Sequence, residues 1–213
     1  MKNYLKSALV IILMVAFTEM HAQIRVGYVF GMNLSTITLK SNGISYDTDM
    51  PVSFHFGGFF EIPVIDNFAL RPGLLFSAKG SNYVIDSLEV SLAPIYIEVP
   101  VNAFYSFGSD VIKVSLFAGP YFACGIGGYK IVSGGQLKDL NYGSGENDDL
   151  RLFDIGLNLG AGVNIRGFLI SVQYGIGLAN ISPVTAFDTE MKNKVIGISI
   201  SAGSPGLSAS FGR

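Results

Sequence analysis

The sequence predicts an all-β protein, an eight-stranded antiparallel up-and-down transmembrane β-barrel. Three observations predict this fold. Bulky apolar residues alternate with small or polar residues along eight segments. The chain has 49% hydrophobic residues and a mean hydropathy of +0.45, yet beyond residue 17 it lacks an apolar run of the roughly 20 residues that a membrane helix needs. The connections between the segments are alternately long and short.

The N-terminus has the features of a secretory signal peptide. Lys2 and Lys6 precede an apolar core at 8–17, and Met20, His21 and Ala22 form a plausible cleavage site. The apolar core is too short to span a membrane. We therefore expect a signal peptide over residues 1–22 and one barrel domain over residues 23–213. The charge of the mature chain is slightly negative, so nothing suggests nucleic-acid binding.

Each expected strand has one face of bulky apolar side chains and one face of Gly, Asn, Ser and other small side chains. The pattern is clearest in a hairpin, where Phe153, Ile155 and Leu157 alternate with Asp154 and other small or polar residues. The expected strands cover 24–36, 53–64, 68–79, 93–105, 111–127, 153–165, 168–179 and 195–202.

The lengths of the connections predict how the barrel is oriented. Short turns lie at 66–67, 106–110 and 166–167, whereas long loops lie at 39–52, 80–91, 128–150 and 180–194. This is the connectivity of outer-membrane barrels, in which short turns face the periplasm and long loops face the exterior. We therefore expect both termini on the periplasmic side and the long loops at the cell surface.

The distribution of side chains favours a membrane barrel over a soluble barrel such as a lipocalin, whose apolar face points inward. The polar face carries few charges, and the apolar face is too bulky to fit inside. Aromatic residues on the apolar face gather at the strand ends, as in the interfacial girdles of membrane barrels. They are Phe68, Tyr105 and Phe168 beside short turns and Phe54, Phe76 and Phe153 beside long loops.

Four prolines fall inside or at the ends of expected strands. A closed barrel has no edge strand on which a missing hydrogen-bond donor could face solvent. We therefore expect local bulges or solvated strand ends at these positions, which are Pro72, Pro94, Pro100 and Pro120.

An ordered series of short segments resembles the PorT-like outer-membrane β-barrel family of Gram-negative bacteria, over nearly all of the mature chain. The segments are VFGMNLS at 29–35, GFFEIP at 58–63, LRPGLLF at 70–76, AKG at 78–80, YIEVP at 96–100, AGPY at 118–121, FDIG at 153–156 and YGIGL at 174–178. The prolines at 72, 100 and 120 belong to these shared segments, which suggests that they are features of the fold.

The resemblance implies an integral outer-membrane barrel, and some relatives are tied to protein secretion or maturation at the cell surface. It supplies no catalytic residues. Barrel proteins commonly end with an aromatic residue in the last strand, and the end of this chain departs from that pattern. Gly203, Ser204 and Pro205 interrupt the last strand, and Phe211 lies beyond it.

An eight-stranded barrel has an interior that side chains just fill, so we do not expect a general porin. Counting outward from the turn at 66–67 brings Glu61 opposite or diagonal to Arg71, and the register around the next loop brings Glu98 near Arg71. We expect a lumen cluster of Glu61, Arg71 and Glu98 that neutralises buried charge. A proton or ion path through this cluster is the less favoured alternative.

Ser53 and His55 share the inward face with Glu61, so these residues could form a Ser/His/acid hydrolase site like that of outer-membrane lipid A deacylases. However, Glu61 is six residues from His55, about 20 Å along a strand. Asp154 or a loop acid would have to orient the imidazole. We favour a structural role for His55.

No metal or cofactor is expected. The sequence contains no CxxC, HExxH, Walker or Rossmann motif, and His55 is the only histidine of the mature chain. Cys124, the only cysteine, lies on the apolar face and is expected to be a small buried or lipid-facing side chain. The acids at 145–149 and Asp139 could bind calcium, but they lack the spacing of a calcium loop and fit solvated loop acids better.

We therefore expect a non-enzymatic, monomeric barrel in contact with outer-membrane lipid, with a structural or interaction role and a protein partner bound through the long loops. A lipid A-modifying enzyme is the first alternative, and a narrow solute channel is the second.

Overall fold

The computed structural model describes residues 24–41, 44–46, 49–85, 88–109, 111–132, 135–145, 148–183 and 189–203. The expected signal peptide and the departure after Gly203 lie outside these residues. The described part folds as β1 (Arg25–Ser41), β2 (Ile44–Tyr46), β3 (Val52–Ile65), β4 (Phe68–Ala78), β5 (Ser81–Ile85), β6 (Leu88–Gly108), β7 (Ile112–Val132), β8 (Lys138–Asp139), β9 (Phe153–Ile165), β10 (Phe168–Gly177) and β11 (Glu190–Gly203). No helix in it is long and apolar enough to cross a membrane.

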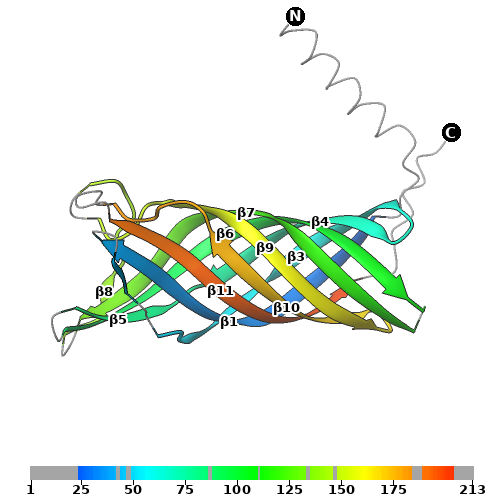
Figure 1. Ribbon diagram of the computed structural model, residues 1–213, viewed down its shortest axis with the longest axis horizontal. Helices are drawn as coiled ribbons and strands as arrows, with labels where there is room; N and C mark the ends of the chain where they lie inside the picture. The colour runs from blue at the N-terminus through cyan, green and yellow to red at the C-terminus, as the bar shows by residue number, and fades with distance from the viewer. Residues whose placement is uncertain are drawn as a thin grey trace, which may run out of the picture.

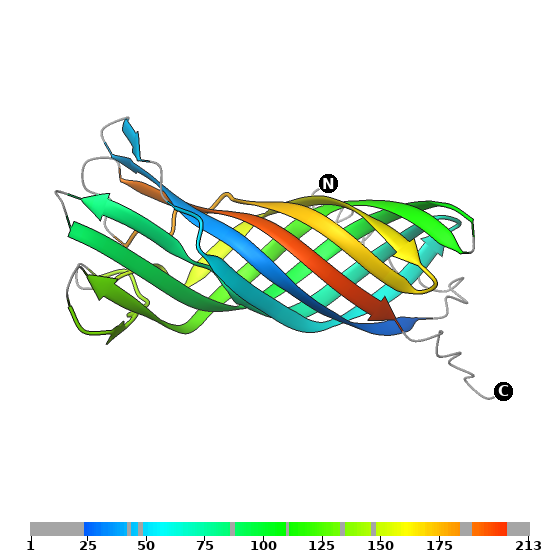
Figure 2. The same ribbon diagram turned by 90° about the horizontal axis from the view of Figure 1, so that it is seen from below.

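Eight of the described strands form a closed ring (Figure 1) in the order β1, β3, β4, β6, β7, β9, β10 and β11. Every neighbouring pair is antiparallel, and β11 pairs again with β1 from Gly27 opposite Gly203 to Lys40 opposite Glu190. The turned view in Figure 2 shows the strands tilted around a single elongated barrel. The predicted eight-stranded up-and-down barrel is therefore confirmed.

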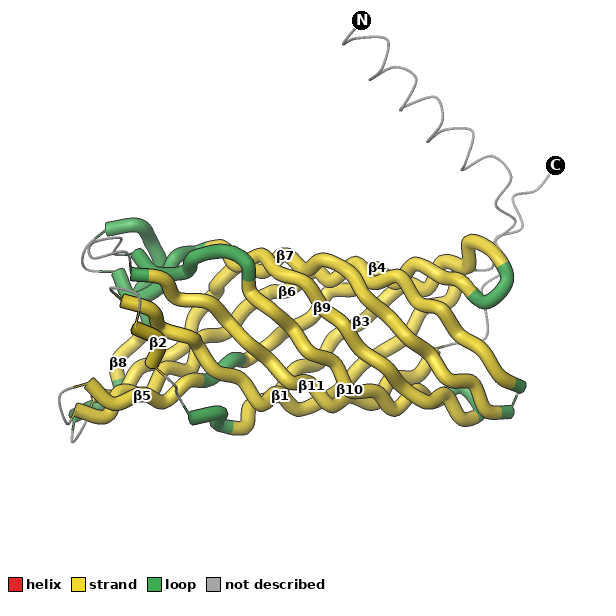
Figure 3. The backbone as a smooth tube through the Cα atoms, in the orientation of Figure 1, coloured by secondary structure: helices red, strands yellow, loops and turns green. Residues whose placement is uncertain are grey.

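The short turns gather at one end of the barrel, together with the start of β1 and the end of β11 (Figure 3). Arg166 and Gly167 both have positive φ angles, of 51° and 94°, as a tight two-residue hairpin turn requires. The Gly167 amide also donates to Asn164 Oδ1 at 3.0 Å. The long connections and the additional strands β2, β5 and β8 lie at the opposite end.

Strands at the long-loop end extend further than the sequence predicted. β6 begins at Leu88 and β11 at Glu190, and β7 continues to Val132. The predicted loops at 39–52 and 80–91 contain β2 and β5, each paired with the adjacent long strand. The prediction failed here because main-chain pairing continues where the side chains no longer alternate.

Three of the prolines lie at gaps in the ladders and the fourth lies next to a bulge. The β6–β7 pairing passes from Ile95 opposite Gly127 to Tyr96 opposite Gly125, directly after Pro94. In the described ladders, bridges are missing beside Pro72, Pro100 and Pro120. The expected local interruptions are therefore present, and they leave the ring closed.

Large apolar side chains cover the outside of the barrel, and the expected girdle residues Phe54, Phe76, Tyr105, Phe153 and Phe168 are among those exposed. Cys124 lies between Ile97 and Phe153 on this outer face. Eight residues of β6 separate Tyr105 from Ile97, which pairs with Phe76. At 3.3 Å per residue and a strand tilt of about 40°, the two levels are about 20 Å apart along the barrel axis. This distance is close to the height of the apolar band of membrane barrels.

Glycines on the inner face make room for rings from the neighbouring strand. The Phe117 ring lies over Gly160 and the Tyr121 ring over Gly156, and a Cβ at either glycine would collide with the ring. The alternation of apolar residues with glycine therefore has two functions. It presents a bulky surface outward and leaves space inside for a few large side chains.

Candidate functional site

The barrel lumen contains three polar layers. From the short-turn end to the long-loop end, they lie at the levels of Arg71 and Leu75 on β4 and of Lys79, the residue that follows β4. We call them the arginine layer (Arg25, Glu61, Arg71), the histidine layer (Asn33, His55, Ser199) and the lysine layer (Lys79, Glu98, Asp154). Above the lysine layer, buried apolar residues form an apolar cap, which consists of Ile37, Leu92, Leu140, Leu150, Ile181 and Met191.

The arginine layer contains two of the three predicted cluster residues. The β3–β4 register places positions 61 and 71 across from each other, and Glu61 Oε2 forms an ion pair with Arg71 Nη2. Arg25 Nη1 lies 3.3 Å from Glu61 Oε1. Sequence reasoning missed Arg25, because its register depends on the long connection between β1 and β3.

Aromatic rings hold the Arg71 guanidinium in place. Its Cζ atom lies 4.4 Å from the centre of the Phe59 ring and 3.9 Å from that of Phe104, distances at which a cation is attracted to a ring face. On the short-turn side, a cavity of about 330 Å³ adjoins this layer and is lined by Arg25, Arg71 and Lys113 among others. The guanidinium and its two rings separate this cavity from the rest of the lumen.

Glu98 is not part of the arginine layer, so that prediction was wrong. In the β4–β6 ladder Arg71 lies opposite Asn102, whereas Glu98 lies opposite Leu75. The difference is four residues, about 13 Å along the strand. The prediction centred the register on an irregular loop, but β5 continues the β6 pairing with Ser81 opposite Leu92 and so shifts the register.

The histidine layer joins three strands through a buried imidazole. His55 Nδ1 lies 2.8 Å from Asn33 Oδ1, and His55 Nε2 lies 2.8 Å from Ser199 Oγ. Ser53, the partner considered from the sequence, instead donates to the Ala78 carbonyl at 2.7 Å. Asp154 belongs to the lysine layer. The sequence could not indicate Ser199, which is 144 residues from His55.

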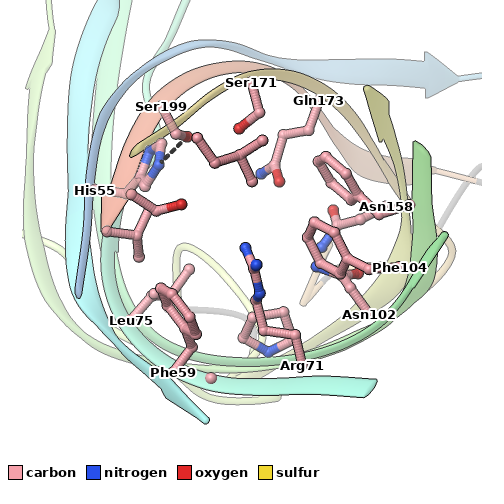
Figure 4. Close-up of a pocket in the computed structure, with 16 residues that line it drawn as sticks. His55, Phe59, Arg71, Leu75, Asn102, Phe104, Asn158, Ser171, Gln173 and Ser199 are labelled. Atoms are coloured by element: carbon pink, nitrogen blue, oxygen red, sulfur yellow. Dashed lines mark hydrogen bonds between the residues drawn. The ribbon is translucent and has the colours of Figure 1, made fainter. Parts of the chain in front are cut away.

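The order of serine, imidazole and amide resembles the nucleophile, base and orienting group of serine hydrolases. Figure 4 shows the cavity beside it, into which Arg71, Gln173 and Ser199 point from different strands. Its volume is about 60 Å³, and a water molecule in the liquid occupies about 30 Å³. The cavity therefore has room for a few water molecules, and an acyl chain does not fit.

The lysine layer is the most deeply buried charged group. Lys79 Nζ lies 3.1 Å from both Glu98 Oε2 and Asp154 Oδ2, and the three side chains are 3%, 6% and 0% exposed. Lys79 also faces the rings of Tyr96 and Tyr121, at 4.9 and 4.5 Å. The sequence signals for Lys79 were its inward position at the end of the third expected strand and its place in the AKG segment of the family resemblance; Glu98 and Asp154 also lie in such shared segments.

Asp154 Oδ2 is the central acceptor of this layer. Besides Lys79, the Tyr121 hydroxyl donates to it at 3.1 Å and the Asn193 amide at 2.8 Å. These contacts join β6, β7, β9 and β11 around the end of β4, so the layer ties together most of the ring.

The apolar cap closes the lumen at the long-loop end. Leu150 and Ile181, which come from the long connections, are completely buried against residues of the ring. Below them, the Tyr142 ring packs edge-on against Tyr96 with 6.1 Å between centres, and its hydroxyl donates to the Gly127 carbonyl at 2.9 Å. Burial raises the pKa of the Tyr142 phenol well above its usual range.

The loop acids considered for calcium have structural partners. Asp149 forms an ion pair with Lys130 and accepts from the Asn141 amide, and Asp148 accepts from the Gly145 amide at 2.7 Å. Glu146 and Asn147 lie outside the described residues. Among the residues described, no group of three or more His, Cys, Asp or Glu side chains could hold a metal ion.

A closed ring with an apolar exterior and a filled polar lumen is the architecture of an outer-membrane barrel. Residues 18–182 match the family model described as outer membrane protein beta-barrel domain. The chain belongs to this family. Its exposed apolar band therefore faces lipid in the outer membrane of the cell.

Several solved outer-membrane barrels are similar to this chain at low identity. Ail of Yersinia pestis, solved with the heparin analogue sucrose octasulfate, has 11% identity and a TM-score of 0.38, and the match covers 84% of this chain and 99% of Ail. Neisserial surface protein A has 13% identity and a TM-score of 0.44, with 83% and 96% covered. OprG of Pseudomonas aeruginosa has 12% identity and a TM-score of 0.37, with 85% and 94% covered. No curated protein matches the sequence.

Proposed function

We propose that this outer-membrane barrel is a non-enzymatic interaction component that works through its long-loop end. Its role is that of an accessory to protein secretion or surface maturation, as its resemblance to the PorT-like barrels implies. The observation that carries the proposal is the filled lumen, in which three polar layers and the apolar cap follow one another. Only the outer face and the two ends remain for function, and lipid covers the outer face.

The long-loop end is the more elaborate of the two ends. β6 and β7 pair as far as Val90 opposite Val132, well beyond the level of Phe76 and Phe153, and β5 and β8 flank them. Tyr129, Ile131 and Leu137 are exposed on this projection. In the proposed orientation it extends from the cell surface, with the termini and the short turns in the periplasm.

The two alternatives receive less support from the geometry. A narrow channel would need a path through the apolar cap, where Leu150 and Ile181 are completely buried. A lipid A-modifying enzyme would need a serine within reach of lipid. Ser199, the serine bonded to His55, is buried inside the lumen.

Photo-crosslinking in cells of the native host tests the proposal. A crosslinking amino acid replaces Leu137, which is 60% exposed at the long-loop end, or Ile65, which is 70% exposed at the short-turn end and serves as the control. We expect one partner protein to be captured from position 137 and not from position 65. We also expect less of the captured partner protein at the cell surface when residues 129–139 of the barrel are replaced by a Gly-Ser segment.

Identical adducts from both positions, or unchanged surface display, would contradict the proposal. A change in the acyl chains of lipid A that depends on Ser199 would favour the enzyme. Stepwise conductance of the purified protein in planar bilayers would favour the channel.

A further inference from the structure

The cavity of about 330 Å³ at the short-turn end of the lumen has the size of a small-ligand site. Asn67 and Gly167, which belong to two of the short turns, line it, so it opens at this end of the barrel. Arg71 and Phe104 form its inner boundary. At about 30 Å³ for each water molecule of the liquid, the volume corresponds to about ten water molecules.

The charged side chains that line this cavity are mostly positive. Arg25 and Arg71 share a single carboxylate, that of Glu61, which leaves an excess of one positive charge among the described residues of the lining. Lys113 also lines the cavity, but it has an interaction partner of its own and is left out of this balance. Two charged residues of the neighbouring turns lie outside the lining and have opposite charges, namely Asp66 and Arg166.

Uncharged polar groups of the lining add hydrogen-bond donors. The Ser106 and Ser115 hydroxyls lie 2.8 Å apart, so one donates to the other and the second hydrogen is left for another acceptor. Asn164 Oδ1 accepts from the Gly167 amide at 3.0 Å, and the side-chain nitrogen of Asn164 retains its two hydrogens as donors. Lys113 lies opposite Asn164 in the β7–β9 ladder. The cavity therefore offers donors from several strands, whereas the carboxylate in its lining is already paired.

We propose that this cavity binds a small phosphorylated organic molecule. Guanidinium groups form charge-assisted hydrogen bonds with phosphate, and a phosphate monoester has a charge of about −1.5 to −2 at pH 7, which the positive lining complements. Its tetrahedral group accepts hydrogen bonds from several directions, as donors on β1, β4, β7 and β9 require. A planar carboxylate has only two oxygens to offer them.

The lining also has an apolar part that suits the organic portion of such a ligand. Pro63 and Phe104 belong to it, together with Ile65 nearer the mouth. This inference concerns the end of the barrel opposite to the one used in the proposed function, and it does not depend on that function.

Isothermal titration calorimetry of the purified barrel in detergent micelles at low salt tests the proposal, with phenyl phosphate as the probe and empty micelles as the blank. We expect saturable binding of one phenyl phosphate per barrel. Benzoate, which presents the same ring with a planar carboxylate, should bind more weakly. Added salt should weaken the binding of phenyl phosphate, because the cavity is open to solvent and its charges are screened.

Three variants separate the cavity from the general charge of the short-turn end. Arg25→Gln removes one cation of the lining and leaves Arg71 paired with Glu61, so the dissociation constant should rise about tenfold to hundredfold, the effect of one charge-assisted hydrogen bond. Arg166→Gln, which removes the same charge outside the lining, is the matched control and should leave the dissociation constant nearly unchanged. Ala69→Leu narrows the cavity without changing its charge and should also weaken binding. The shift in gel mobility on heating verifies that each variant is folded.

Three results would overturn the proposal. The first is the absence of saturable binding of phenyl phosphate to the wild type at low salt. The second is binding of benzoate as tight as that of phenyl phosphate, because the site would then not select a phosphate group. The third is equal weakening by Arg25→Gln and Arg166→Gln, because binding would then follow the net charge of this end of the barrel and not the cavity.

Discussion

The arginine layer and the lysine layer perform the same task at different heights of the lumen, but they are built in different ways. The arginine layer has two cations for one carboxylate and adjoins an open cavity. The lysine layer has one cation for two carboxylates and is almost completely buried. Glu61 and Arg71 are separated by ten positions of one hairpin, whereas Lys79 and Asp154 are separated by 75.

This difference shows that burial and connectivity decide how much each ion pair matters. A pair within one hairpin beside an open cavity can lose a partner and be compensated by solvent that enters this cavity or by Arg25. When a pair joins distant strands in a fully buried interior, the loss of one partner cannot be compensated in this way. The free energy of unfolding should therefore depend much more on the lysine layer than on the arginine layer.

The largest effect is expected from Lys79→Met, which leaves two carboxylates buried without a counter-charge. We expect a loss of about 3–5 kcal/mol in the free energy of unfolding, measured by urea titration in detergent micelles. Adding Glu98→Gln and Asp154→Asn to the same chain should restore much of the loss. Lys138→Met, at an exposed position of β8, is the control. A loss for Lys79→Met that is no larger than the loss for Arg71→Met would contradict the comparison of the two layers.

Arg71→Met should have a smaller effect, because Arg25 remains beside Glu61. We expect a loss of about 2 kcal/mol from one charge-assisted bond and the contacts with the Phe59 and Phe104 rings. The same urea titration would show it, together with a lower temperature for the shift in gel mobility on heating. An unchanged unfolding temperature would remove any stabilising role for the Glu61–Arg71 pair. A loss equal to that of Lys79→Met would contradict the comparison.

The uncharged histidine layer provides a baseline between the two charged layers. Ser199→Ala removes one hydrogen bond beside a cavity with room for water, so we expect a loss of about 1 kcal/mol. Ser201→Ala, which lines the same cavity, is the matched control and should cost less. Wild-type protein should remain unlabelled by a fluorophosphonate probe. Labelling that disappears with Ser199→Ala would reveal a reactive serine and weaken the non-enzymatic proposal.

The smallest effect on stability, and the sharpest test of the corrected register, comes from paired cysteines on the outer face. In a Cys124→Ser background, Leu70→Cys with Ala103→Cys should form a disulfide, because these positions lie opposite each other. Leu70→Cys with Val101→Cys represents a register shifted toward the predicted one and should crosslink poorly. Non-reducing gels distinguish the two pairs. Preferential crosslinking of the second pair would support the register predicted from the sequence, in which Glu98 lies closer to Arg71.

Particular residues show how far the sequence could lead. Glu61 and Arg71 were predicted as a pair because a short turn fixes the register of its hairpin. Glu98 was misplaced because the next connection is a strand extension, whose pairing the polar composition of 80–91 concealed. Arg25, Lys79 and Ser199 were missed as members of the lumen layers. Arg25 meets Glu61 across the β1–β3 ladder, whose register depends on a long connection, whereas Lys79 reaches Asp154 and Ser199 reaches His55 between strands that are not neighbours in the ring.

The sequence by itself determined the number of membrane-crossing strands, their inward and outward faces, the short turns and the interruptions at the prolines. These features are local, since the period of two, the turn residues and the missing proline donor all act within a few residues. Only the tertiary structure decided which inward side chains meet, how the apolar cap closes the mouth, and that one buried layer has an excess of negative charge. Closure of the ring sets the relative heights of strands that are far apart in the sequence, and the charge balance of the lumen depends on those heights.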